Sequence, residues 1–422
     1  MELQEHLFRR EAGRMVATLT RIFGVEHLAL AEDVVQDAFC RALEVWPFRG
    51  VPENPSAWLM ATARHRALDL LRRDRTARTF APEVGRLLET EAAPAVEELF
   101  GAHAIRDDQL RMMFSCCHPS LPETAQVALI LHILCGFSVD EIAGAFVSTH
   151  AAIEKRLTRA KHTLSGSKRL FEIADDADLA ARLPAVHRAL YLLFNEGYHG
   201  ASPESAVRVE LCREAMRLAA LLLEHPPAAT PVTHALAALM WLHAGRLPAR
   251  LDAAGRLSLL ADQDRARWDP GLIDEGRRLL ELSARGARLS EYHVEAAIAA
   301  VHASASSVDA TDWPEIVKLY DLLMTIRPTP VVALNRAIAI AQRDGPERGL
   351  EEIVAIADRD RLVGYPFYHA AAGELALRGG RDGAARQHFL VAMALARNAM
   401  ERQFLRQRIG ACEVGVPQPA GQ

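Results

Sequence analysis

The chain has 422 residues, of which 50% are hydrophobic and 24% are charged. This is the balance of a globular protein, and the length predicts two to four domains instead of one core. A net charge of −5 excludes a protein that coats nucleic acid with its whole surface. The apolar stretches of the chain are shorter than the roughly 18–20 residues that cross a bilayer. The first residues, MELQEHLFRR, lack the apolar core of a signal peptide. We therefore expect no membrane contact and a cytoplasmic location.

The cysteines show no disulfide pattern and are expected to be small buried residues in a reducing compartment. They are Cys40, Cys116, Cys117, Cys135, Cys212 and Cys412. The string Cys116-Cys117-His118 suggests zinc, but adjacent cysteines cannot easily both bind one ion, and no CxxC pair lies nearby. No GxxxxGK[ST], GxGxxG or GxSxG motif occurs either. We therefore expect no metal, no cofactor, no catalytic residues and no enzymatic activity.

Positive charge is concentrated in two short segments of this acidic chain. Residues 64–78 contain six arginines against two aspartates, and residues 154–169 contain six lysines and arginines against one glutamate. Two local basic patches indicate two separate contacts with a polyanion.

Helical periodicity dominates the chain from end to end, which predicts an all-α protein. We expect one helical module at 1–80, a linker at 81–107 rich in Ala, Glu and Pro, a second helical module at 108–170, and a helical extension at 178–422.

The extension contains small residues and a phenylalanine at the spacing of a tetratricopeptide helix pair. They are Gly373, Gly380, Ala385, Phe389 and Ala392. An earlier unit about 35 residues upstream places Gly345, Leu350, Val354 and Ala357 at the corresponding positions. A stack of helix pairs is expected, because each pair buries its apolar face only against a neighbour.

Residues 31–46 are expected to form an amphipathic helix. Val35, Phe39, Ala42 and Trp46 repeat at helical spacing and form one apolar stripe. The other side is mostly acidic and carries Asp33, Gln36, Asp37, Cys40 and Glu44. Taken alone, the polar side of such a helix indicates an ordinary solvent-exposed face. The segments that follow it in the chain are what indicate a binding role.

A loop from Pro47 to Pro55 is expected next, followed by a helix that Ser56 caps. This helix carries Trp58 in its first turn and several outward-facing arginines. Aromatic residues beside a basic helix suit single-stranded DNA, since a base can stack while cations hold the phosphates. Taken alone, the pattern favours Trp46 and Trp58 as core residues.

Residues 121–164 carry the strongest local pattern, that of a helix-turn-helix. A buried helix ends at Gly136, Ser138 and Glu141 form a capping box for the next helix, and Thr149 caps the last one. The last helix has an apolar seam made by Ile153, Leu157, Ala160 and Leu164. Its opposite side carries Lys155, Arg156, Thr158, Arg159 and His162. A purely structural hairpin is the alternative, but the basic second helix favours a recognition helix in a DNA major groove.

In this order, the segments resemble the sigma-70 family, and specifically its extracytoplasmic-function branch with regions 2 and 4 only. AEDVVQDAFCRALEVW resembles region 2.2, NPSAWLMATARHRALDLLRR resembles regions 2.3 and 2.4, and PETAQVALILHILCGFSVDEIAGAF with IEKRLTRAKHTL resembles region 4. FSCCHPSLP, NEGYH, DQDRARWD, TDWPEIVKLYD and PTPVVALNRAIAIA resemble the subgroup with a helical-repeat C-terminal extension.

The resemblance implies a sigma factor whose partners are promoter DNA and core RNA polymerase, through the β′ clamp helices and the β flap. For polymerase binding it implies Asp33, Gln36, Asp37 and Phe39. For the −10 element it implies the loop from Pro47 to Asn54 together with Trp58, Arg64, His65, Arg66, Arg72 and Arg73. For the −35 element it implies Thr149, His150, Lys155, Arg156, Thr158, Arg159 and Lys161. His65 and Glu154 depart from the residues common in the family, which leaves the promoter sequence open.

Two other hypotheses fit part of the sequence. A helix-turn-helix regulator with a tetratricopeptide-type partner domain that never binds polymerase leaves residues 31–78 without a role. An enzyme in the C-terminal half would need Glu196 or the charged string of Asp262, Asp264, Arg265, Arg267 and Asp269, which we expect instead to form ion pairs. Our hypothesis for residues 178–422 is regulation in cis, by docking on the sigma regions or by binding a regulatory protein.

Overall fold

The structure is a computed structural model, and the residues it describes are 2–73, 108–117, 120–146, 148–165, 176–199, 207–252, 256–258 and 260–414. These residues are helical, with no strand among them beyond one bridge between Leu251 and Leu257, which confirms the all-α prediction. The predicted linker at 81–107 lies outside the described residues, and the predicted domain boundaries stay predictions.

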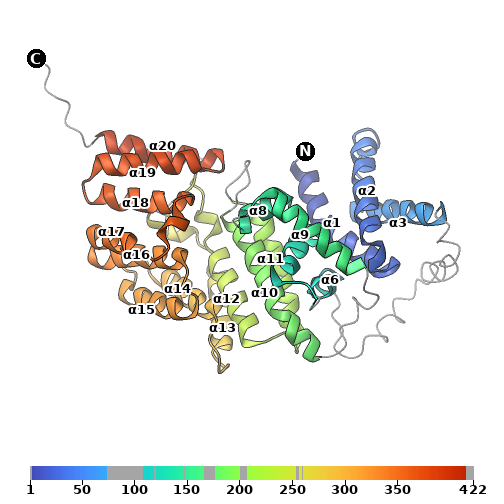
Figure 1. Cartoon of the computed structure of the whole chain (residues 1–422), viewed down its shortest axis with the longest axis horizontal. Coiled ribbons are helices and arrows are strands. Elements are labelled where there is room, and N and C mark those ends of the chain that lie inside the picture. The colour runs from blue at the N-terminus through green and yellow to red at the C-terminus, as the bar shows by residue number, and fades with distance from the viewer. Residues whose placement is uncertain are drawn as a thin grey trace, which may run out of the picture. The chain divides into compact units, whose positions relative to one another are not determined.

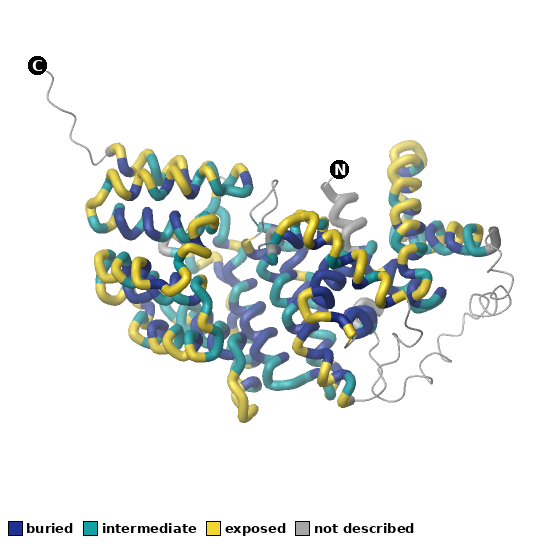
Figure 2. Tube along the Cα trace, viewed as in Figure 1, coloured by how far each residue is buried: buried dark blue, intermediate teal, exposed yellow. Residues whose placement is uncertain are grey.

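The chain divides into two compact units. Unit 1 comprises Met1–Leu193 and Arg217–Ala229, and unit 2 comprises Phe194–Met216 and Thr230–Gln422. In Figure 2 the buried residues of each unit lie on the inner sides of its helices and the exposed residues on the outer sides.

Unit 1 contains the helices of both predicted DNA-binding modules (Figure 1). They are α1 (Glu2–Phe23), the 3-10 turn η1 (Val25–His27), α2 (Leu28–Arg49), α3 (Pro55–Arg73), α6 (Asp108–Cys116), α7 (Glu123–Leu129), the π-helical turn η2 (Ile130–Leu134), α8 (Val139–Phe146) and α9 (His150–Ser165). The helices α10 (Asp176–Tyr198) and α11 (Val209–Glu224) are divided between the two units.

The first helix of the chain packs directly on the second module. Gly13 of α1 lies so close to η2 that a Cβ atom there would overlap the carbonyl oxygen of Leu134. The same helix also packs on α6, and η1 packs on α9. In this structure the two predicted modules therefore form one packed body.

The helix α2 differs from its prediction at two places. Its buried seam consists of Val34, Val35, Ala38, Ala42 and Trp46, whereas Phe39 is only half-buried. The helix also continues through Pro47 to Arg49, where a loop was expected. A proline in the last turn removes only one hydrogen bond, and buried Trp46 anchors that turn against the core. Gly50, with φ 79°, then ends the helix through a bond from its N–H to the Trp46 carbonyl.

Unit 2 is a series of helices in which each packs on the next along the chain (Figure 1). They are α12 (Pro231–Ala244), α13 (Pro270–Ser283), α14 (Glu291–Ser304), α15 (Trp313–Ile326), α16 (Pro330–Asp344), α17 (Pro346–Val354), α18 (Pro366–Arg378), α19 (Asp382–Leu395) and α20 (Ala399–Val414). Short 3-10 turns lie between them at η3 (Leu247–Ala249), η4 (Leu260–Asp262), η5 (Arg265–Arg267) and η6 (Arg359–Leu362).

Several of these helices begin with a capping side chain followed by proline. Thr230, Asp269 and Thr329 each accept a backbone hydrogen bond from the third helical residue, and a proline follows each of them. Proline suits the first helical position because its missing N–H would have no partner there. These local signals fix where each helix starts.

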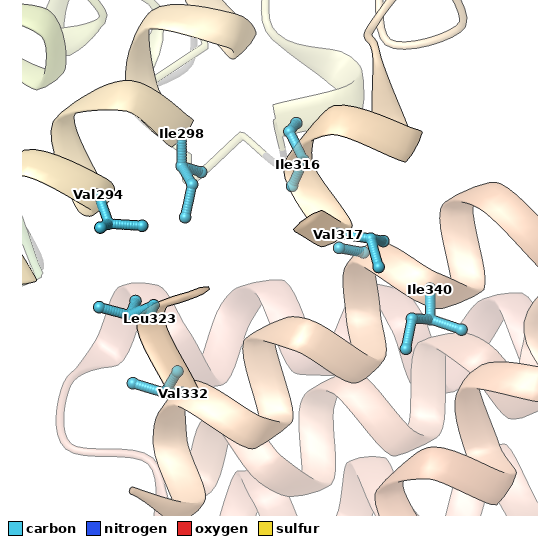
Figure 3. Close-up of a cluster of buried hydrophobic side chains, with 8 residues drawn as sticks. Val294, Ile298, Ile316, Val317, Leu323, Val332 and Ile340 are labelled. Carbon is cyan, nitrogen blue, oxygen red and sulfur yellow. The ribbon is translucent and has the colours of Figure 1, made fainter. Parts of the chain in front are cut away.

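Apolar side chains from consecutive helices interlock to form the core of unit 2. Figure 3 shows Val294 and Ile298 of α14 near Ile316 and Val317 of α15, with Val332 from α16 in the same cluster. Each helix thus buries its apolar face against its neighbours, as expected for stacked helix pairs.

The last helix pair confirms the close approach that its small residues predict. A Cβ atom on Gly373 of α18 would lie 2.8 Å from the ring of Phe389 on α19, and Ala385 and Ala392 are buried beside that ring. The proposed register of the preceding pair is wrong, because Val354 and Ala357 are exposed. In that pair Gly349, Ile353 and Ile356 are buried, and they precede Ala385, Phe389 and Ala392 by 36 residues each.

Candidate nucleic-acid interface

The helix α9 presents a polar and basic face opposite a fully apolar seam. Its buried residues are the predicted ones, Ile153, Leu157, Ala160 and Leu164, and they hold it against α7 and α8. Lys155, Thr158 and Arg159 are exposed on the other side, while Arg156 is half-buried and lies 5.7 Å above the ring of Phe146. A helix held by one side with cations on the other can enter a DNA groove.

The predicted caps around the helix-turn-helix are confirmed. The backbone N–H of Ser138 donates to Glu141 Oε2 at 2.7 Å, and the N–H of Glu141 donates to Ser138 Oγ at 3.2 Å. Thr149 Oγ1 accepts from the N–H of Ala152 at 3.3 Å. Gly136 adopts the left-handed conformation, with φ 67°, that ends the preceding helix.

His150, the first residue of α9, is bonded to the preceding helix. Its Nδ1 lies 2.6 Å from Asp140 Oδ1, and both side chains are exposed. This hydrogen bond and the charge of Asp140 raise the pKa of His150 above its ordinary value. At the start of α9, His150 therefore becomes positively charged more readily than a free histidine does.

Lys161 forms an ion pair with the first module instead of facing solvent freely. Its Nζ donates to Glu32 Oε1 at 2.8 Å and to Oε2 at 3.0 Å, and the two side chains are only 28% and 20% exposed. Glu32 belongs to α2, so this pair joins α9 to α2.

The outer face of α2 carries the expected polar residues. Asp33, Gln36 and Asp37 are exposed there. Asp37 accepts a hydrogen bond at 2.9 Å from Nε of Arg66 on α3, so one residue predicted for polymerase and one predicted for DNA are paired. His65 is exposed and Arg64 is half-buried, whereas the side chains of Arg72 and Arg73 lie outside the description.

The two tryptophans near the junction of α2 and α3 differ in burial. Trp46 is buried, as predicted, and Trp58 is half-buried with its ring 5.6 Å from that of Trp46 in an edge-to-face arrangement. The cap of α3 is Asn54, whose Oδ1 accepts from the N–H of Ala57 at 3.1 Å, and not Ser56 as predicted.

The two most exposed apolar residues beside this helix start lie in the segment 47–54 that the family resemblance assigned to the −10 element, although neither was singled out there. Phe48 is 88% exposed and Val51 is 56% exposed. Pro47 predicted a loop, but Phe48 lies in the last turn of α2, and its side chain stays outside the buried seam of that helix. An exposed ring next to a basic helix offers a stacking surface for an unpaired base.

Known protein families match three segments of the chain. Residues 7–77 match Sigma-70 region 2, and residues 111–164 match Sigma-70, region 4. An uncharacterized protein of Rhizobium meliloti (strain 1021) is 42% identical over 395 residues, which cover 93% of this chain and 92% of that relative. The chain belongs to the sigma-70 family. It is a sigma factor of the extracytoplasmic-function type, with regions 2 and 4 for promoter recognition and a helical C-terminal extension.

Part of the extension of this sigma factor has a family match of its own. Residues 182–284 match a family of unknown function (DUF6596). No solved structure matches the chain. None of the helices in the described part of the chain combines the length and the apolarity that crossing a bilayer requires.

The cysteines of the sigma factor are buried, with one exception. Cys40 is exposed on α2, contrary to the prediction, because it lies on the polar side of that helix. Burial raises the pKa of the Cys116 thiol to about 12, and that of Cys117 also rises. Buried thiols of this kind stay protonated at neutral pH. Among the described residues no group of three or more His, Cys, Asp or Glu side chains could hold a metal, and His118 lies outside them.

The charged motifs of the extension have mostly structural contacts. Glu196 forms the expected buried ion pair, with Arg208 Nη2 at 3.0 Å. The expectation of ion pairs in the string at 262–269 is wrong, because Asp264 and Asp269 cap helix starts through backbone N–H groups. Arg265 and Arg267 donate to backbone carbonyls instead of carboxylates.

Proposed function

We propose that this sigma factor binds core RNA polymerase and carries it to promoters, where region 4 contacts the −35 element and region 2 contacts the melted −10 element. The observation that carries the polymerase part is the exposed row of Asp33, Gln36 and Asp37 on α2, opposite a continuous buried seam. In this proposal these residues and Phe39 dock on the β′ clamp helices, and region 4 docks on the β flap.

The −35 contact relies on the exposed face of α9. Its proposed residues are Thr149, His150, Lys155, Arg156, Thr158, Arg159 and Lys161. Arginine and lysine on a recognition helix bind phosphates and guanine edges, and the phosphate contacts give an affinity that falls as salt rises. Phosphate contacts set the register, and base contacts add sequence preference.

The −10 contact relies on the junction of α2 and α3. Its proposed residues are Trp58, Arg64, His65, Arg66, Arg72 and Arg73, and the exposed ring of Phe48 joins them. Unpairing a base costs a few kcal/mol, and stacking on an aromatic ring with cation contacts to the backbone offsets that cost. The sigma factor performs no chemistry itself in this scheme, and the polymerase transfers the nucleotides in the cytoplasm.

Binding to core polymerase tests this part of the proposal directly. The full chain is mixed with purified core enzyme and the complex is isolated by size. Replacing Asp33, Gln36 and Asp37 together by alanine is expected to weaken the complex. The fold is expected to stay intact, because the removal of exposed side chains leaves no cavity. The matched control replaces Asp274, Glu275 and Glu281 of α13 by alanine. If the wild-type chain does not associate with core enzyme, the alternative of a helix-turn-helix regulator with a tetratricopeptide-type partner domain replaces the proposal.

For the extension we propose regulation in cis, by docking on the sigma regions or by binding a regulatory protein. A truncation that removes the extension must leave unit 1 intact. Unit 1 includes the first part of α10, where Arg182 donates to the Phe114 carbonyl of α6 at 3.1 Å. A chain that ends after Ala229 retains all of unit 1. Promoter-directed transcription is then compared between the shortened chain and the full chain. Equal transcription under all conditions would exclude the regulatory role.

A further inference from the structure

Three arginines of unit 2 lie together without a carboxylate partner. Arg246 follows α12, Arg250 follows η3, and Arg265 lies in η5. None of the carboxylates that the structure describes forms an ion pair with any of them. Arg246 is only 7% exposed, and its guanidinium lies over the ring of Trp268. We call these three residues the arginine cluster.

Aromatic rings hold the arginine cluster in place. The guanidinium of Arg246 lies 5.3 Å from the centroid of the Trp268 ring, and that of Arg265 lies 4.6 Å from the same centroid. Arg250 lies 4.6 Å from the ring of Tyr198, and its Nη2 donates to the Tyr198 carbonyl at 3.0 Å. Stacking fixes each guanidinium plane. Nη1 of Arg265 already donates to the carbonyls of His302 and Ala305, so the groups available to a ligand are the remaining N–H groups, among them Nη2 of Arg265.

The nearby carboxylates are committed to other partners. Glu196 pairs with Arg208, and Asp252 pairs with Arg256 at 2.7 Å. Asp264 and Asp269 cap helices. The positive charge of the arginine cluster is therefore not balanced by the acidic residues that flank it in the sequence.

Neutral histidines line the same region. Burial lowers the pKa of His243 and of His302 to about 3, and the charge of Arg246 contributes to both shifts. The ring of His243 lies 5.1 Å from that of Tyr198. These histidines add hydrogen-bonding atoms without adding charge that would compensate the arginines.

Several polar atoms of this region are buried without a hydrogen-bond partner. They are Nε of Arg246, Nε of Arg250, Nη2 of Arg265, Nδ1 of His243, Nδ1 of His302 and the hydroxyl of Tyr198. A buried donor without an acceptor is unfavourable, and a buried charge without a counter-charge is more so. One bound oxyanion would satisfy both needs, since arginine binds the oxygens of phosphate through parallel N–H bonds.

We propose that the arginine cluster of Arg246, Arg250 and Arg265 binds the phosphate group of a small molecule. The burial of Arg246 over the Trp268 ring favours a small ligand over the backbone of a DNA duplex, which contacts exposed side chains. All three arginines lie within the 182–284 segment that matches the family of unknown function. The site is independent of the proposed polymerase and promoter contacts.

Titration of the full chain with inorganic phosphate tests this inference. Melting temperature and calorimetric heat are followed at millimolar phosphate, with chloride at equal ionic strength as reference. Because phosphate stabilises many proteins nonspecifically, the decisive quantity is the difference from a variant. Arg246→Met keeps the stem on Trp268 and removes the charge, and it is expected to weaken phosphate binding about ten- to hundredfold.

The controls separate a ligand site from a structural stack. Arg278→Met removes an exposed arginine of α13 that pairs with Glu275, and it is expected to leave phosphate binding unchanged. Without phosphate, Arg246→Met is expected to melt no lower than the wild type, since it removes an unpaired buried charge. Arg265→Met serves as a second variant in case the first does not fold.

Three results would overturn the inference. One is the absence of a saturable phosphate response in the wild type, and another is an equal response in Arg246→Met, Arg265→Met and Arg278→Met. The third is a response to malonate or to a short oligonucleotide that exceeds the phosphate response, which would assign the cluster to a carboxylate ligand or to nucleic acid.

Discussion

Lys161 of α9 donates to both carboxylate oxygens of Glu32 on α2, at 2.8 and 3.0 Å. One residue of this pair belongs to region 4 and the other to region 2, so a cation proposed for DNA is held by the other module. Together with the contact of Gly13 against Leu134, the pair defines a packed arrangement of the two regions in the free chain.

Breaking this pair is expected to increase the affinity of the free chain for duplex promoter DNA. Glu32→Gln removes the counter-charge and leaves Lys161 available to a phosphate. For a partly exposed pair worth about 1 kcal/mol, the expected gain is about fivefold in the dissociation constant. Glu26→Gln, an exposed residue of η1 with the same loss of charge, is the control in a filter-binding or anisotropy assay. Equal affinities of the two variants would show that the pair does not restrain region 4.

The exposed ring of Phe48 predicts a DNA defect without a folding defect. Phe48→Ala is expected to change the free energy of unfolding by no more than about 0.5 kcal/mol, because 88% of the side chain is already in solvent. Its binding to a single-stranded −10 oligonucleotide is expected to weaken by about 1–3 kcal/mol, the range for loss of one stacked base. Trp46→Ala, at the buried neighbour, is expected to lose about 3–5 kcal/mol of stability. Unchanged oligonucleotide binding by Phe48→Ala would remove this residue from the interface.

The close approach of Gly373 to Phe389 predicts opposite effects of two similar substitutions. Gly373→Ala places a methyl group 2.8 Å from the ring and is expected to destabilise the fold by about 1–3 kcal/mol. Gly383→Ala on α19 meets no atom within 4 Å, so it is expected to stabilise that helix by up to about 1 kcal/mol. Urea denaturation followed by circular dichroism measures both. A Gly373→Ala variant as stable as Gly383→Ala would contradict the packing of α18 on α19.

The contact of His150 with Asp140 predicts a stability that depends on pH. Folding raises the pKa of His150, mainly through its hydrogen bond with Asp140. Such a group stabilises the fold fully below its unfolded pKa, and this contribution is lost as the pH rises through the raised folded pKa. NMR titration of His150 is expected to give a higher pKa in the wild type than in Asp140→Asn, and the wild type is expected to lose its stability advantage toward alkaline pH. Identical titration curves in the two proteins would rule out this contact in solution.

Local signals explain why the helix-turn-helix could be predicted from the sequence. The capping box of Ser138 and Glu141 and the cap at Thr149 depend on residues three positions apart, and the seam of α9 depends on helical period alone. The end of α2 was mispredicted for a related reason. Pro47 is a local helix-breaking signal, but the burial of Trp46 at the same turn is a tertiary effect that outweighs it.

Contacts between distant residues could not be predicted in this way. Arg66 pairs with Asp37 and Lys161 pairs with Glu32 across 29 and 129 residues of sequence, and no periodicity relates the partners. The arginine cluster shows the same limit. The sequence around Arg265 contains enough aspartates to suggest ion pairs, and only the structure shows that these carboxylates cap helix starts and leave the arginines unbalanced.

Initiation in vitro tests the central claim most directly. The full chain and purified core polymerase are incubated with a library of genomic fragments, and the transcript start points are mapped in single-round reactions. We predict transcripts from defined start points that share upstream elements, and their loss when Lys155 and Arg159 are both replaced by alanine. Transcripts without any defined start point, or starts that are the same without the chain, would contradict the assignment of this protein as a promoter-directing sigma factor.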